Sequence, residues 1–300
     1  FFSTPTPPSA ILSGLVGSEM CIRDRVDTWP KMPKYWEFGI ASDVYVNSAD
    51  EIHVFSRGLH PLTIWDKDGN FISSWGEGTF SNNEHGIYIT KEDTIWLVDS
   101  WFHIATEHKP NGELIRTIGN KLQPSETYNG LPFNMPTGLS ISSKGDIFIS
   151  DGYGNKKVHK FDSNGELIKS WGTFGDKPGE FAIVHNLEFD SKDRLFVCDR
   201  ENNRIQIFDD EGNFLEEWTD LFMPGDLWIK DDIVYVCEQT EQGGVSIWTT
   251  EGELITRWHG DRGDGKGTIL SGHGICVDSE GSIYVAELSP AERVQKFQKV

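Results

Sequence analysis

Two stretches of the sequence share one pattern along their whole length. The first reads HGIYITKEDTIWLVDSWFHIATEHKPNGELIRTIG from His85 to Gly119, and the second reads HNLEFDSKDRLFVCDRENNRIQIFDDEGNFLEEW from His185 to Trp218. Each begins with a run of alternating apolar and polar residues. A polar turn follows, and after it come two further runs of strand-like residues. A hairpin signal, Asn111-Gly112 or Glu211-Gly212, then leads into a last run. The pattern predicts four short antiparallel strands in each stretch.

The same unit recurs along the chain at a regular spacing. Equivalent strand starts fall at Ser42, His85, Thr137, His185, Gly225 and His273. The spacing averages about 46 residues, which is the length of a propeller blade, and no helical periodicity separates the strands as it would in a TIM barrel. The sequence therefore predicts an all-β, six-bladed β-propeller.

The last unit, which begins at His273, has only three predicted strands before Val300. An outer strand has to come from elsewhere, because an unpaired sheet edge is a liability. We expect an N-terminal strand at Tyr35-Trp36-Glu37-Phe38 to close the ring, with nothing before Val26 needed for closure.

The N-terminal segment differs from the rest of the chain. Residues 15–25 read LVGSEMCIRDR, which matches, codon after codon, the translation of a transposase-type sequencing adapter. The segment lacks the basic start and the uninterrupted apolar run of a signal peptide. We therefore interpret residues 1–25 as a disordered assembly artefact and expect residues 26–300 to form one propeller domain.

The charge balance bears on the partners of the protein. The chain has 27 basic and 47 acidic residues, for a formal net charge of −20. Such a surface repels phosphate backbones and anionic lipid, so we expect no nucleic-acid or membrane partner. We expect a monomer that acts on a small molecule or peptide bearing a carboxylate.

Cysteine use bears weakly on the compartment. Apart from Cys21, we expect Cys198, Cys237 and Cys276 to be buried strand residues. There is no CxxC and no disulfide framework, which favours the cytoplasm slightly. A secreted location stays open, because the true start and any targeting signal are missing.

Alternate units place a histidine at the strand start. The innermost strand of a propeller blade starts beside the central channel, so His85, His185 and His273 are expected to converge with threefold geometry. Three imidazoles with an open fourth position suit catalytic zinc. One such histidine alone would more often be structural, but packing does not account for the strict alternation. We interpret His53, His103, His108, His159 and His259 as surface or strand residues.

The second strand of each unit is expected to end at the same mouth of the channel. The residues at these ends are Arg57, Ser100, Gly152, Arg200, Gln239 and Leu288. Arg57 and Arg200 together can clamp a carboxylate, although either one alone could equally form a surface ion pair between blades. Tyr153 can act as a general base if its pKa is lowered, although a tyrosine in a glycine-rich turn more often packs.

Several motifs resemble those of a known family. They are VFSRG (54–58), EHGI (84–87), SDGYGN (150–155), VHNL (184–187), CDRENNRIQ (198–206) and GHGI (272–275). The units are similar to NHL repeats, and residues 26–300 resemble the lyase domain of peptidylglycine α-amidating enzymes, peptidyl-α-hydroxyglycine α-amidating lyase. NHL repeats alone are not specific, whereas the DGY and DRENNRIQ motifs at these separations are more so.

The resemblance implies a zinc-dependent carbon–nitrogen lyase that cleaves peptidyl-α-hydroxyglycine to a peptide amide and glyoxylate. The zinc ligands of the family match the three axial histidines, its proton-accepting tyrosine matches Tyr153, and its two active-site arginines match Arg57 and Arg200. No copper monooxygenase partner is present on this chain. Two other functions stay open: a lactonase-like metal-dependent hydrolase and a non-catalytic NHL interaction module.

The same resemblance implies a structural calcium ion. Its ligands in the family are two backbone carbonyls, matching Val44 and Ile87, and an aspartate just after the last histidine. Here Gly274 stands at the aspartate position, so one carboxylate ligand is lost. A cysteine that follows the catalytic tyrosine in the animal enzymes is also absent, with Gly154 in its place.

Overall fold

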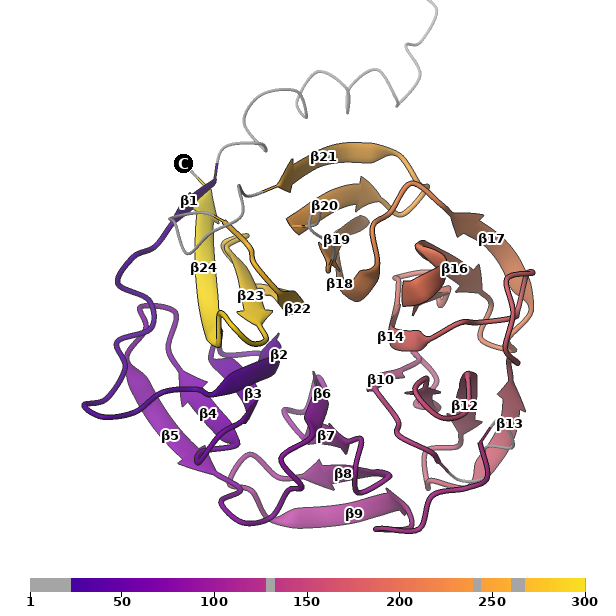
Figure 1. Cartoon of the computed structure of the whole chain (residues 1–300), viewed down its shortest axis with the longest axis horizontal. Helices are drawn as coiled ribbons and strands as arrows, with labels where there is room; N and C mark the ends of the chain where they lie inside the picture. Colours follow the sequence, from indigo (N-terminus) through magenta and orange to yellow (C-terminus); the bar gives the residue numbers. More distant parts are fainter. Residues whose placement is uncertain (1–22, 128–132, 240–243, 260–267, 300) are drawn as a thin grey trace, which may run out of the picture.

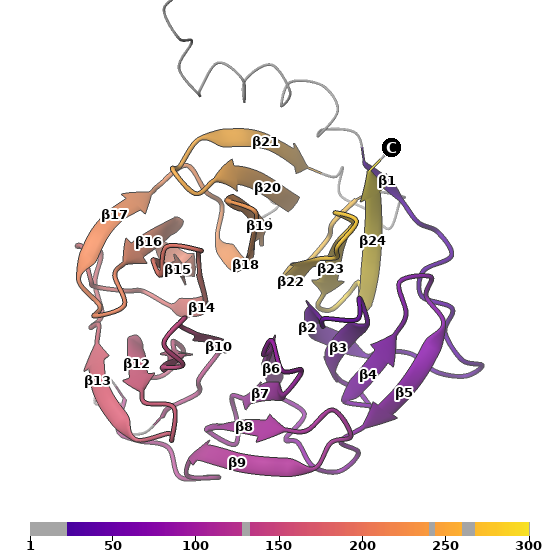
Figure 2. The same cartoon turned by 180° about the vertical axis from the view of Figure 1, so that it is seen from behind.

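The computed structural model describes residues 23–127, 133–239, 244–259 and 268–299. Over these residues the chain forms six four-stranded antiparallel sheets around a central axis (Figure 1). The view from behind shows the innermost strand of every sheet facing that axis (Figure 2). The prediction of an all-β, six-bladed propeller is confirmed. The described part of the chain holds no helix long and apolar enough to cross a membrane.

Each blade runs outward from the axis in chain order. Blade one has β2 (Ile40–Val46), β3 (Ile52–Arg57), β4 (Leu62–Trp65) and β5 (Phe71–Trp75). Blade two has β6 (Glu84–Ile89), β7 (Ile95–Asp99), β8 (Ile104–His108) and β9 (Leu114–Gly119). Blade three has β10 (Gly138–Ile141), β11 (Ile147–Asp151), β12 (Lys157–Phe161) and β13 (Leu167–Trp171).

The other three blades follow the same plan. Blade four has β14 (Val184–Phe189), β15 (Leu195–Asp199), the 3-10 turn η1 (Arg200–Asn202), β16 (Arg204–Phe208) and β17 (Phe214–Trp218). Blade five has β18 (Pro224–Lys230), β19 (Ile233–Glu238), β20 (Gly244–Thr249) and β21 (Leu254–His259). Blade six has β22 (Gly272–Val277), β23 (Ile283–Glu287), β24 (Arg293–Lys299) and, as its outer strand, β1 (Arg23–Arg25).

The repeated tryptophans and turn glycines pack on one another between blades. Gly112 has φ +86°, and a Cβ at this position would lie 2.8 Å from the ring of Trp75, at the end of the preceding blade. Trp171 lies against Gly212 in the same way. A glycine in these turns therefore serves both the left-handed backbone and the close approach of an indole ring.

The ring is closed by an N-terminal strand, but not by the expected one. Arg23–Arg25 pair with β24 in the register Arg23↔Lys299 to Arg25↔Phe297, and Val26 N–H donates to the Lys296 carbonyl. The expected strand at Tyr35–Phe38 was wrong, since this segment is not a strand.

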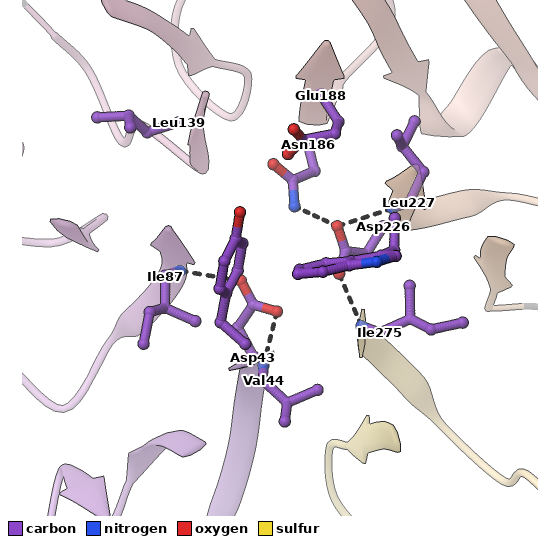
Figure 3. Close-up of a pocket in the computed structure, with 11 residues that line it drawn as sticks. Asp43, Val44, Ile87, Leu139, Asn186, Glu188, Asp226, Leu227 and Ile275 are labelled. Atoms are coloured by element: carbon purple, nitrogen blue, oxygen red, sulfur yellow. Dashed lines mark hydrogen bonds between the residues drawn. The ribbon is translucent and has the colours of Figure 1, made fainter. Parts of the chain in front are cut away.

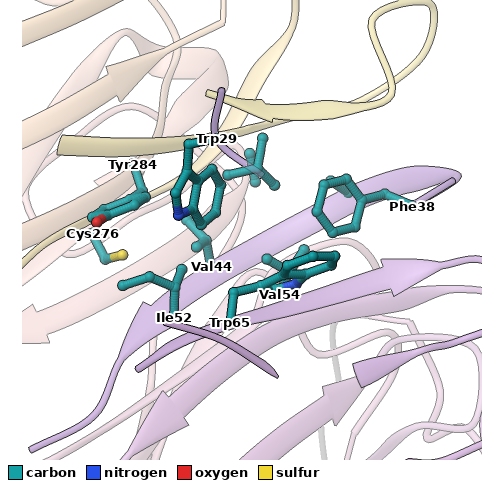
Figure 4. Packing of buried hydrophobic residues seen from close by; sticks show 11 residues of the cluster. Trp29, Phe38, Val44, Ile52, Val54, Trp65, Cys276 and Tyr284 are labelled. Atoms are coloured by element: carbon teal, nitrogen blue, oxygen red, sulfur yellow. The ribbon is translucent and has the colours of Figure 1, made fainter. Parts of the chain in front are cut away.

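The segment after β1 is held by core packing instead. Trp29 is buried against Tyr284 of blade six, and Phe38 is buried against Trp65 of blade one (Figure 4). These side chains fill the gap between the first and last blades, so the backbone that carries them crosses the gap and does not extend the sheet. The expectation of disorder therefore fails for Arg23–Arg25, while residues 1–22 with Cys21 lie outside the described residues.

Hydrophobic clusters join neighbouring blades. The described cysteines and histidines interpreted from the sequence as buried, surface or strand residues lie within or beside these clusters. Cys198, Cys237 and Cys276 are free and fully buried, as predicted. The histidines interpreted as surface or strand residues are buried where their side chains are described, at His53, His103, His108 and His159. Three of these four lie in strands, whereas His103 lies in the turn before β8. The side chain of His259 lies outside the described residues.

Because β1 closes the ring, the stability of the protein should depend strongly on its three residues, Arg23–Arg25. Deleting residues 1–25 should lower the free energy of unfolding by about 1–3 kcal/mol relative to deleting residues 1–22, because β24 loses its paired edge. Denaturant unfolding followed by tryptophan fluorescence measures the difference. Equal stability of the two truncated chains would show that β1 does not close the ring.

Candidate metal centre

Three histidines from alternate blades meet on the axis. His85, His185 and His273 belong to the starts of β6, β14 and β22 and are 2%, 1% and 3% exposed. Their ring centroids are 4.7–4.8 Å apart. One ligand atom from each lies within 4.8 Å of the others, so the group could hold a metal ion. Three protein ligands leave a position open for a substrate atom.

A β-bulge at the start of the inner strand directs each histidine to the axis. Glu84 pairs with Asp99 and Gly86 pairs with Val98, so His85 is an extra residue between them. The same shift of register occurs in β14 and β22. Bulges re-aim side chains in this way and are common beside active sites.

A backbone carbonyl of the following blade orients each imidazole. The Nδ1 atom of His85 lies 2.6 Å from the Thr137 carbonyl oxygen. His185 makes the same contact with Gly225, and His273 with Ser42, both at 2.6 Å. A carbonyl can only accept, so Nδ1 carries the proton and Nε2 keeps its lone pair. The intervening blades therefore serve the site through their main chain.

The environment keeps the imidazoles uncharged. Burial lowers the pKa of His85 and His185 well below the ordinary range, and that of His273 to about 3. Neutral imidazoles with free Nε2 atoms are the form that coordinates a metal ion.

Tyr153 extends over the histidines, and its hydroxyl contacts the unprotonated ring nitrogens of two of them. Its hydroxyl oxygen lies 2.9 Å from His85 Nε2 and 3.1 Å from His185 Nε2. One hydroxyl proton can serve only one of these two acceptors, and the described residues offer no second donor between them. Buried acceptors are rarely left without a partner, so the donor set fits a bound metal ion.

The two arginines lie on the same side of the channel as Tyr153. Arg57 ends β3, and its Nε donates to the Glu84 carbonyl at 3.0 Å, immediately before a metal-site histidine. Arg200 opens η1, with its guanidinium carbon 5.7 Å from the centroid of the Tyr153 ring. Glu201 accepts from Arg200 at 2.7 Å, which is an ion pair within one turn and not between blades.

A second group lies one layer deeper in the channel. Asp43 and Asp226 face a cavity of about 10 Å³ that Val44 and Ile87 also line (Figure 3). Burial and the neighbouring Asp226 carboxylate raise the pKa of Asp43. A Cβ at position 274 would lie 2.4 Å from Asp43 Oδ1, so this carboxylate fills the space of the missing side chain.

The calcium ligand set implied by the resemblance lacks its aspartate here, because position 274 is glycine. Val44 and Ile87 donate their N–H groups to Asp43, at 2.8 and 2.9 Å, and the expected role of their carbonyls stays a prediction. The Asp226 carboxylate likewise accepts N–H groups from Leu227 and Ile275. No step of the function proposed below passes through this cavity.

Sequence reasoning missed both of these aspartates. They directly follow Ser42 and Gly225, so they occupy the same place in blades one and five. The alternating histidines lie in blades two, four and six, whereas the aspartates lie in blades one and five. In the aligned repeats, each aspartate is one residue after the strand start, which is Ser42 or Gly225.

Comparison with known proteins places the chain among NHL-repeat propellers. The NHL repeat model matches residues 133–161, which include β10, β11 and β12. Human NHL repeat-containing protein 3 is 31% identical over 207 residues, covering 65% of this chain and 59% of that protein. Peptidyl-alpha-hydroxyglycine alpha-amidating lyase 1 of Drosophila melanogaster is 28% identical over 271 residues, covering 80% of this chain and 48% of that protein.

A solved structure shares the fold at low identity. The gluconolactonase from Xanthomonas campestris superposes with a TM-score of 0.63 at 12% identity, covering 87% of this chain and 88% of that one. Identity this low shows a common fold alone. The chain is therefore a six-bladed β-propeller with an NHL repeat match at residues 133–161 and with similarity to the peptidyl-alpha-hydroxyglycine alpha-amidating lyases.

Proposed function

We propose that the protein is a zinc-dependent lyase that cleaves the C–N bond of peptidyl-α-hydroxyglycine-like substrates, releasing an amide and glyoxylate. The observation that carries the proposal is the convergence of three neutral imidazoles on the axis, with the Tyr153 oxygen 2.9 and 3.1 Å from the Nε2 atoms of two of them. The names of the amidating-lyase relatives support the choice of reaction.

Tyr153 is the residue placed to accept the hydroxyl proton of the substrate. When bound at the three histidines, zinc supplies Lewis-acid polarisation of a substrate oxygen. Once its own hydroxyl proton has been released, the Tyr153 oxygen takes the proton from the carbinol hydroxyl, the O–H electron pair forms the aldehyde C=O bond, and the C–N pair leaves with the amide nitrogen. Tyr153 then gives the same proton to that nitrogen, so the amide and glyoxylate together contain all the atoms of the substrate and the tyrosine returns to its starting state.

We assign the carboxylate of the substrate to the two arginines. Arg57 uses its Nε to bond the main chain at Glu84, so its two terminal nitrogens would be the donors to a ligand. Arg200 also lies beside the Tyr153 ring, and the two cations come from different blades. A guanidinium binds a carboxylate in bidentate fashion, which would fix the hydroxyl against Tyr153.

Metal content tests the site itself. The protein purified with zinc should contain one zinc ion per chain by mass spectrometry of the metal, and zinc at a hundredfold excess over Kd should stabilise it by about 3 kcal/mol. His185→Ala should abolish both effects. His60 lies between β3 and β4, with its Nδ1 3.0 Å from Glu77, and His60→Ala should keep both effects. Full zinc content in His185→Ala would contradict the assignment, and a metal-free wild type would favour an interaction module.

Replacing the proposed base tests the chemistry. Tyr153→Phe should lower kcat for glyoxylate release from α-hydroxyhippurate by about a hundredfold or more, because the proton acceptor is lost. Zinc content should not change. Tyr35→Phe, at an exposed position, is the matched control and should behave as the wild type. Lactone hydrolysis without glyoxylate release by the zinc-loaded wild type would favour a lactonase-like enzyme instead.

Replacing an arginine tests the carboxylate clamp. Arg57→Met should raise KM for α-hydroxyhippurate about ten- to hundredfold, because a charge-assisted pair of hydrogen bonds is lost. The KM for the uncharged methyl ester should change far less. Arg116→Met, on the outer strand β9, serves as control. An equal rise of KM for acid and ester would refute the clamp.

A further inference from the structure

Tyr153 belongs to a turn that has no spare room on either side. The turn spans residues 152–155, between β11 and β12. A Cβ on Gly152 would lie 1.8 Å from the Val184 carbonyl oxygen, and a Cβ on Gly154 would lie 2.4 Å from that of Asn134. Only glycine permits both approaches, so the turn is wedged between the start of β14 and the segment before β10.

The carbonyl oxygens of this turn are held by one ammonium group. The Nζ of Lys156 donates to the Gly152 carbonyl at 2.9 Å and to the Tyr153 carbonyl at 2.7 Å. No other hydrogen bond to either oxygen is seen in the described part of the chain. Buried carbonyls without a donor are costly, so these two depend on the lysine.

The lysine itself is in an unusual position. Lys156 is 7% exposed, which is rare for its residue type, and its φ is +57°. A long side chain rarely adopts the left-handed region, and such conformations persist where the surroundings determine them.

The next residue offers a contrast. Lys157 is also a lysine, and its Nζ donates to a single carbonyl, that of Gly172, at 3.2 Å. Gly172 follows the outer strand β13. Lys156 lies before β12 and Lys157 begins it, and the two adjacent lysines bind different carbonyls.

We infer that Lys156 is a positioning residue that holds the Tyr153 hydroxyl over the histidines by binding the carbonyl oxygens of the tyrosine turn. The inference rests on the proposed role of Tyr153 for its effect on catalysis. It does not require Lys156 to touch the substrate. The hydroxyl oxygen lies 2.9 and 3.1 Å from two imidazoles, and reaction rates fall steeply when a reacting group is displaced by about 1 Å.

Kinetics separate positioning from general stability. Lys156→Met should lower kcat for glyoxylate release about tenfold or more, with KM within about twofold and zinc content unchanged. Lys156→Arg, which keeps a cation, should recover most of the loss, and Lys157→Met should retain the wild-type kcat. In a Tyr153→Phe background, Lys156→Met should have no further effect, because residues that act through one another are not additive.

A second readout does not depend on activity. In protein labelled with 3-fluorotyrosine, the ¹⁹F signal that Tyr153→Phe removes belongs to Tyr153. This signal should shift or broaden in Lys156→Met and stay in place in Lys157→Met. If no variant releases glyoxylate but the signal moves as expected, the proposed function fails and the positioning role stands.

Three outcomes would overturn the inference. One is an unchanged ¹⁹F signal in Lys156→Met, and another is an equal loss of kcat in the Lys156 and Lys157 variants. The third is a further loss when Lys156→Met is added to Tyr153→Phe. Should Lys156→Met not fold, Lys156→Gln supplies the same comparisons with a shorter side chain that keeps one donor group.

Discussion

Each axial histidine donates its Nδ1–H to a carbonyl of the following blade, and these bonds tie the centre of the propeller together. His85 reaches blade three, His185 reaches blade five, and His273 reaches Ser42 of blade one, which joins the last blade to the first. The same bonds set the tautomer that leaves every Nε2 lone pair free. Blade closure and metal-binding competence therefore depend on one repeated contact.

The contact also explains why the intervening positions can carry different residue types in different blades. Ser42, Thr137 and Gly225 have nothing in common as side chains, yet each supplies a carbonyl oxygen at the same place. A main-chain group is available from any residue. The threefold site is thus built on a sixfold scaffold, with alternate blades giving side chains and backbone.

The repeats themselves predict much of the candidate site. The histidines, Tyr153 and the arginines were found because equivalent positions of a propeller share one distance from the axis. The closing strand was not found, because Tyr35–Phe38 has strand-like composition while the large rings of Trp29 and Phe38 fill the gap between the first and last blades. Hydrophobic composition alone does not distinguish a strand from a segment that packs across it.

The sequence by itself determined the number of blades, the axial histidines and the mouth residues, because a repeat of constant length maps directly onto symmetry. Only the tertiary structure decided which atoms complete the site. Lys156 bonds the carbonyls of Gly152 and Tyr153, four and three residues before it, and Asp43 fills the space above Gly274 from a different blade. The repeat pattern of the sequence does not reveal such contacts, because they depend on the direction of the backbone and on close approach between blades.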